Sequence, residues 1–236
     1  MKKLLALAVF STSVLAVHNG SLVNPSRFPA SGTVKTDLIG CAVVAVGPKA
    51  FLTSASCAPS MNSYTAYEVR FTLTPNTYYR AHCNAHPLYD AKATPRAFDI
   101  AACETYNEIT GIAFAEVITG SPSRNAALAF VGHGAPDCRA PETRDGKLRM
   151  KRASIAGLKG SVLSYQGAQA SYGDTGAGFY DRSDRLVALQ ISAAQGLMPQ
   201  AALWLGHPEV QSFLETWADD HGGVCGISSG DVCDPR

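Results

Sequence analysis

A glycine-rich hexapeptide, Gly173-Asp174-Thr175-Gly176-Ala177-Gly178, places a hydroxyl group and a carboxyl group on neighbouring residues. A second carboxylate, Asp99, directly precedes a short apolar run, and Ser56 lies next to Cys57. A hydroxyl acts as a nucleophile only beside a base, because its own pKa lies far above neutrality. These residue types therefore point to acyl transfer, provided that the chain also supplies a base.

Histidine is the side chain best suited to that role near neutral pH. The chain has six, which are candidate bases by residue type alone: His18, His82, His86, His133, His207 and His221. The segment His82-Cys83-Asn84-Ala85-His86 also suggests a zinc site. Its spacing does not match a standard structural zinc set, and no further Cys/His pair completes it. We therefore expect no metal and no cofactor.

The first 16 residues predict a secretory signal peptide. Lys2 and Lys3 precede an apolar run, Leu4–Phe10, and Ala16 ends a stretch suited to signal peptidase. This predicts cleavage between Ala16 and Val17 and a secreted or periplasmic protein. No Cys lies at the cleavage site and no later stretch is apolar for 18 residues, so we expect no membrane anchor.

Bulk composition narrows the classes of partner. The formal net charge of +1 argues against a nucleic-acid binder or a polybasic membrane binder. Seven cysteines fit an oxidising compartment, in agreement with export. Because seven is odd, at least one thiol is free or pairs with another chain.

The elements that would position these side chains are mostly short strands punctuated by Gly, Pro, Asn and Asp. Strands are predicted at Leu38–Val46, Tyr67–Leu73, Ala126–Val131, Arg149–Ile155, Gly160–Tyr165 and Leu186–Ile191. One helix is predicted near the end, where Pro208 suits a first turn and Gly222-Gly223 a stop. The tail after it, residues 222–236, holds Cys225 and Cys233, whose spacing suits a small disulfide loop. Two unpaired thiols are the alternative.

Three segments, taken in order, resemble the trypsin-like serine protease family. Phe51-Leu52-Thr53-Ser54-Ala55-Ser56-Cys57 is similar to the family's L-T-A-A-H-C, and Cys41 precedes Cys57 by the family's spacing. His86-Pro87-Leu88-Tyr89 and Phe98-Asp99-Ile100-Ala101 resemble H-P-x-Y and D-I-A-L. Gly173–Gly178 resembles G-D-S-G-G-P. Weaker echoes of the family occur at Val131-Gly132-His133-Gly134 and Gly146–Arg149.

The resemblance spans roughly residues 17–218 and implies an all-β fold of two packed six-stranded antiparallel barrels with a C-terminal helix. We assign this domain to residues 17–221. The family's pattern implies a Cys41–Cys57 disulfide. It also places Cys83 on the strand neighbouring Cys103 and so implies a second disulfide, Cys83–Cys103.

The resemblance also implies a dismantled catalytic triad. Ser56 stands in place of the histidine and Thr175 in place of the serine, while Asp99 keeps the aspartate position. If the fold is right, no other histidine segment faces Ser56. Gly173 and Thr175 occupy the oxyanion-hole positions.

Val17 would be the new N-terminus after signal cleavage. The family pairs such an amine with the residue at the position of Asp174, and we expect a Val17–Asp174 ion pair. The alternative is that Asp174 only caps a turn.

The specificity pocket is expected to include Gln169 and Ser192. Gln169 replaces the aspartate of trypsins, and Ser171 stands where the family often has a Cys. Cys138 lacks an evident partner and is the expected free thiol, with a disulfide-linked dimer as one consequence.

The function implied is that of an exported, proteolytically inactive homologue that binds a protein or peptide through the protease scaffold. One alternative is an active serine-type endopeptidase or esterase that uses Thr175 and an unrecognised base. A second alternative is a structural surface protein linked by disulfides between chains.

Overall fold

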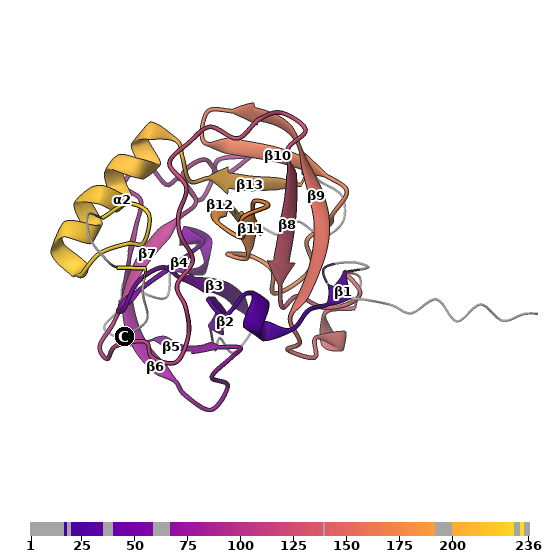
Figure 1. Cartoon of the computed structure of the whole chain (residues 1–236). Coiled ribbons are helices and arrows are strands. Elements are labelled where there is room, and N and C mark those ends of the chain that lie inside the picture. The colour runs from indigo at the N-terminus through magenta and orange to yellow at the C-terminus, as the bar shows by residue number, and fades with distance from the viewer. Residues whose placement is uncertain are drawn as a thin grey trace, which may run out of the picture.

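The computed structural model describes residues 17, 20–34, 40–58, 67–138, 140–191, 200–228 and 232–233. They form two closed antiparallel β-barrels packed together, with an α-helix beside the first barrel (Figure 1). The predicted fold class is thereby confirmed. The expected signal peptide and Ser192 lie outside the described residues. In the described part of the chain, no helix is both long and apolar enough to cross a membrane.

The first barrel closes through six strands in the neighbour order β2-β3-β4-β7-β6-β5. They are β2 (Ser31–Val34), β3 (Cys41–Ala45), β4 (Ala50–Thr53), β5 (Tyr67–Phe71), β6 (Tyr79–Ala85) and β7 (Ala101–Thr105). Every residue of β2, β3 and β4 is buried. These strands therefore lack the polar–apolar alternation of a half-exposed sheet.

The second barrel closes in the order β8-β9-β10-β13-β12-β11, because β8 pairs with both β9 and β11. Its strands are β8 (Ala127–Gly132), β9 (Arg149–Lys159), β10 (Val162–Gln166), β11 (Gly178–Tyr180), β12 (Leu186–Gln190) and β13 (Ala201–Trp204). A short strand, β1 (Ser21–Leu22), adds to β9. Stacked rings of Phe130 and Phe179, 4.5 Å apart, lie in its core.

Among the described residues, three short 3₁₀ helices lie in the connections: η1 (Pro25–Arg27), η2 (Ala55–Cys57) and η3 (Pro141–Thr143). The predicted C-terminal helix is α2 (Pro208–His221). Proline suits its first turn, and Gly222 ends it with φ of 87°, a left-handed conformation that glycine adopts without steric cost. The buried face of α2, which includes Leu214 and Trp217, packs toward β7.

Three disulfides cross-link the fold. Cys41–Cys57 joins β3 to η2, and Cys83–Cys103 links directly opposed residues of β6 and β7. Cys225–Cys233 closes the tail loop beyond α2. All three pairs expected from the sequence are present, and they fit an oxidising environment.

Candidate functional site

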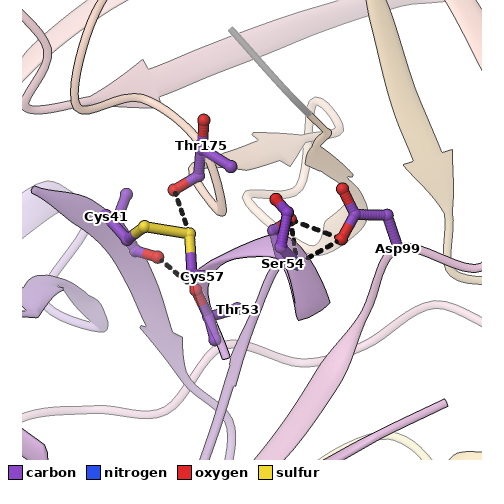
Figure 2. Close-up of a disulfide and its surroundings, with 8 residues drawn as sticks. Cys41, Thr53, Ser54, Cys57, Asp99 and Thr175 are labelled. Carbon is purple, nitrogen blue, oxygen red and sulfur yellow. Dashed lines mark hydrogen bonds between the residues drawn. A yellow bond between two sulfur atoms is a disulfide. The ribbon is translucent and has the colours of Figure 1, made fainter. Parts of the chain in front are cut away.

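Asp99 lies at the end of the loop that leads into β7, fully buried. Its Oδ1 accepts two hydrogen bonds of 2.7 Å, one from the Ser54 hydroxyl (Figure 2) and one from the Ser56 backbone N–H. Its Oδ2 has no hydrogen-bond partner among the described residues. Burial raises the pKa of Asp99, and the bonds from Ser54 and Ser56 oppose that rise.

The start of η2 brings the two serines to this carboxylate. Ser54 caps η2, and its side-chain oxygen accepts from the Ser56 N–H at 3.3 Å. The two hydroxyl oxygens are 2.6 Å apart. Since the Ser54 hydrogen goes to Asp99, Ser56 is the donor between the two hydroxyls. The position expected for an imidazole is thus part of a small hydroxyl network on a buried carboxylate.

Thr175 lies on a tight turn just before β11. The turn is closed by the Asp174 N–H bonded to the Ser171 carbonyl at 3.0 Å and by the Ala177 N–H bonded to the Asp174 carbonyl at 2.9 Å. The Thr175 carbonyl accepts from the Ala42 N–H at 2.8 Å. Its oxygen also lies 3.9 Å from Cys57 Sγ (Figure 2). The segment around the Cys41–Cys57 disulfide in the first barrel therefore packs against this turn of the second barrel.

Glycine is required at two positions of this turn. Gly173 and Gly176 have φ of 94° and 88°, which side chains rarely allow. A Cβ on Gly176 would stand 2.2 Å from the Ala42 carbonyl oxygen, so the two barrels could not approach as they do. The glycine pattern around Thr175 thus serves both turn geometry and barrel packing.

Asp174 points into the protein rather than to the surface. Its carboxylate is fully buried and accepts from the N–H groups of Gly134 and Ser171, each at 2.8 Å. A Cβ on Gly132 or Gly134 would stand 2.1 or 2.4 Å from an Asp174 oxygen. The Gly132-His133-Gly134 motif therefore makes the space that this carboxylate fills.

Burial raises the pKa of Asp174 to about 7, although two N–H donors and the guanidinium groups of Arg144 and Arg149 oppose the rise. Val17, its expected partner, is buried with the core of the second barrel and has φ of 43°. A β-branched residue rarely adopts such a φ. In the described chain Val17 still follows residues 1–16, so its nitrogen is an amide, and the expected ion pair stays a prediction.

Only some of the residues expected at the specificity pocket lie in the described part of the chain. Gln169 is half-buried, and its Nε2 lies 3.6 Å from the sulfur of Cys138. Ser171 is buried, whereas Ser192 is outside the described residues. Cys138 is free, as expected, but its thiol is buried, which hinders a disulfide to another chain.

The described histidines are engaged away from Ser56. His86 stacks on Phe98 and bonds the Glu209 carbonyl, and His207 caps α2. His133 is buried and bonds the Thr72 hydroxyl, and burial among arginines lowers its pKa to about 3. His82 and His221 lie near Glu104, and His18 is not described.

Two residues at the site were not anticipated from the sequence. Ser54 stands where the family's L-T-A-A-H-C stretch has alanine, which was an available signal. Arg144 gave none. Its guanidinium lies against Gly40 and Gly173, so close that a Cβ at these two positions would stand 1.6 and 3.0 Å from its nitrogens.

A pocket of about 440 Å³ lies between the barrels beside Arg144. Its lining is Thr33, Val34, Arg70, Tyr78, Arg144, Asp145 and Gly146. Both oxygens of Asp145 accept from Arg149 at 2.7 Å. The positive charge of the pocket therefore comes from Arg70 and Arg144.

Comparisons with known proteins place the fold. No protein-family model and no curated protein matches the chain. A solved structure described as neuropsin, a serine protease expressed in the limbic system of mouse brain, aligns with a TM-score of 0.69 and 15% identity. The alignment covers 86% of this chain and 98% of that one. The chain therefore has the two-barrel fold of a trypsin-like serine protease.

Proposed function

We propose that the protein is an exported, proteolytically inactive homologue of trypsin-like serine proteases that binds a protein or peptide. The observation that carries the proposal is the surroundings of Asp99. Its carboxylate bonds the Ser54 hydroxyl and the Ser56 N–H, where an active enzyme of this fold would orient an imidazole. A serine hydroxyl does not accept a proton near neutral pH, so a nucleophile here has no base.

The size of the expected defect supports a non-catalytic role. Loss of the base alone lowers turnover by roughly 10⁶ in a protease with an equivalent triad. The methyl group of Thr175 adds a second defect, because it restricts the side-chain rotamer of the hydroxyl. An intact oxyanion frame leaves residual catalysis of roughly 10³–10⁴ over water, which is too little for a protease.

Export would complete the scaffold under this proposal. Cleavage after Ala16 frees the Val17 amine, and a cation beside the buried Asp174 carboxylate would offset part of the cost of burying it. N-terminal sequencing of the exported protein tests this step. A start other than Val17 would contradict it.

The pocket between the barrels is the binding surface that we favour. Arg70 and Arg144 line it, and neither is neutralised by Asp145, which pairs with Arg149. Carboxylates suit guanidinium groups because they accept two parallel hydrogen bonds. The proposed ligand is therefore a peptide segment with acidic side chains.

Activity is tested with a fluorophosphonate probe on the purified mature protein. We expect no labelling, and none in a Thr175→Ala variant. Labelling that disappears in Thr175→Ala would establish an active hydroxyl and overturn the proposal. The double variant Ser56→His with Thr175→Ser is the matched positive case, and we expect it to gain labelling and peptide hydrolysis.

Binding is tested by fluorescence anisotropy with short labelled peptides rich in Asp and Glu. We expect saturable binding that weakens when Arg70 and Arg144 are both changed to Glu. The double variant Arg124→Glu with Arg182→Glu, two exposed arginines outside this pocket, is the charge-matched control. Equal loss in the control would show a general charge effect rather than a site.

A further inference from the structure

Three potential metal ligands converge where α2 meets the first barrel, near the end of β7 opposite to the end that follows Asp99. His82 on β6 and Glu104 on β7 are directly opposed in the antiparallel register. Opposed residues share one face of a sheet, and His82 Nε2 lies 3.5 Å from Glu104 Oε2. Both side chains are partly exposed, at 45% and 27%.

The helix brings the third side chain to the same place. Trp217 and His221 are four residues apart and share one face of α2, with their rings stacked at 4.5 Å. His82 and Asn84 are two residues apart and share one face of β6. The Trp217 Nε1–H donates to Asn84 Oδ1 at 3.1 Å, which fixes the helix to the strand. His221 then falls next to His82, with ring centroids 6.2 Å apart.

A hydrogen bond sets the orientation of the His221 ring. Its Nδ1 lies 2.8 Å from the Trp217 carbonyl oxygen, so Nδ1 carries the hydrogen and donates it. In a neutral imidazole, Nε2 then holds the lone pair. Metal-binding histidines commonly have this arrangement, because the outer hydrogen bond holds the ring and raises its basicity.

We propose that His82, Glu104 and His221 form a zinc site that clamps the end of α2 to the β6–β7 edge. Their ligand atoms all lie within 4.8 Å of one another. Tetrahedral zinc with bonds of about 2.0–2.1 Å needs its ligand atoms about 3.3 Å apart. Small rotations of these partly exposed side chains supply the difference.

The donor set selects the class of ion. Two imidazoles and one carboxylate suit zinc and neighbouring transition metals, whereas calcium and magnesium prefer oxygen ligands alone. The C-terminal end of a helix also carries a partial negative charge, which favours a cation. Water would fill the fourth position.

Sequence spacing did not indicate this site, because it pairs His82 with His86, its near neighbour along the chain. His86 is instead buried against Phe98 and the helix. The true neighbours of His82 come from β7 and from the last turn of α2.

The test is isothermal titration of the full-length mature protein with Zn²⁺. We expect one ion per chain and a rise in Tm. His82→Asn, Glu104→Gln and His221→Asn should each weaken binding at least about tenfold, the lower effect seen when even an outer-shell partner is lost. His207→Asn keeps the α2 cap, since asparagine caps well, and should leave the affinity unchanged.

A second measurement needs no variant of the site. Cu²⁺ binds such ligands more tightly than Zn²⁺ and quenches a nearby indole. In a Trp204→Phe background, where Trp217 is the one remaining tryptophan, we expect Cu²⁺ to quench the fluorescence and excess Zn²⁺ to reverse the quenching. Absence of binding, or binding unchanged in the His82→Asn and His221→Asn variants, would overturn the proposal.

Discussion

The Ser54 hydroxyl donates to Oδ1 of Asp99 over 2.7 Å, within a fully enclosed site. This bond takes part of the role that an imidazole N–H has in an active triad. Together with the Ser56 N–H, it satisfies one oxygen of the buried carboxylate with uncharged donors. The stability of this site should therefore depend on the Ser54 hydroxyl.

Ser54→Ala should destabilise the protein by about 1–3 kcal/mol, because it removes a hydrogen bond to a buried acceptor. Burial raises the pKa of Asp99, and the hydrogen bond from Ser54 opposes that rise because it stabilises the ionised form. Removing a donor raises that pKa further, and the loss should therefore be larger at pH 8 than near pH 4. Urea unfolding at both pH values measures it. Ser183→Ala, on an exposed turn, is the control, and an equal loss at both pH values would contradict the prediction.

Asp174 should make the uncleaved chain less stable as pH rises. Its pKa is about 7 in the folded chain against an ordinary value of 3.8. The folded state therefore binds a proton that the unfolded state has lost, and this contribution declines between pH 4 and pH 7. Its full size is about 4 kcal/mol, at 1.36 kcal/mol per pKa unit.

Comparison of the uncleaved chain with its Asp174→Asn variant isolates this contribution, since other titrating groups cancel in the difference. After cleavage at Val17, the new amine should lower the pKa of Asp174 and reverse the slope. Identical pH profiles for the cleaved and uncleaved chains would argue against the Val17–Asp174 pair.

Much of the fold was predictable from the sequence, because strand alternation and helix-end residues are local patterns and the family's motifs follow one another in order along the chain. Alternation identified β5, and Pro208 and Gly222 marked α2. Strands β2, β4, β7, β11 and β13 were not predicted individually, since they have three to five residues and are buried at nearly every position. Periodicity carries no information when both faces of a strand are covered. Strand β6 has an alternating pattern, yet only the resemblance indicated strands at Cys83 and Cys103.

The site was predictable only at the positions that match a motif. The resemblance of the segments around Ser56, Asp99 and Thr175 to the family's motifs predicted that these residues share one site. The structure joins the Ser56 N–H to Asp99 and places Cys57 beside Thr175, and the roles of these residues stay predictions. Arg144 reaches Gly173 through the path of a connecting loop, which no sequence spacing specifies. The three residues of the proposed zinc site come from three separate elements, so sequence spacing did not predict that they meet.

The Cys41–Cys57 disulfide should be more important than its loop length suggests. Removing it with alanine at both positions relaxes a loop spanning 16 residues, which costs about 3 kcal/mol from chain entropy. The segment also carries the contacts of Ala42 and Cys57 with Thr175. We therefore expect the variant to lose more than the corresponding Cys225/Cys233 variant, whose bond spans 8 residues. Chemical denaturation of both variants gives the comparison. The twofold difference in loop length alone accounts for about 0.6 kcal/mol, so a difference no larger than that would show that the docking contacts add nothing.

His133 should make the protein sensitive to acid. Burial beside Arg144, Arg70 and Arg149 lowers its pKa to about 3, so the folded state keeps the ring neutral while the unfolded chain protonates it near pH 6.5. The stability that depends on the neutral ring is present above pH 6.5 and is lost as pH falls toward 3, by up to about 5 kcal/mol.

His133→Gln retains a polar group for the Thr72 hydroxyl and does not titrate, so its stability should fall less over this range. Unfolding measured at pH 7 and pH 4.5 for both proteins decides the matter, with His207→Gln as the control on a partly exposed histidine. Parallel pH profiles for the natural chain and His133→Gln would mean that another group causes the acid sensitivity.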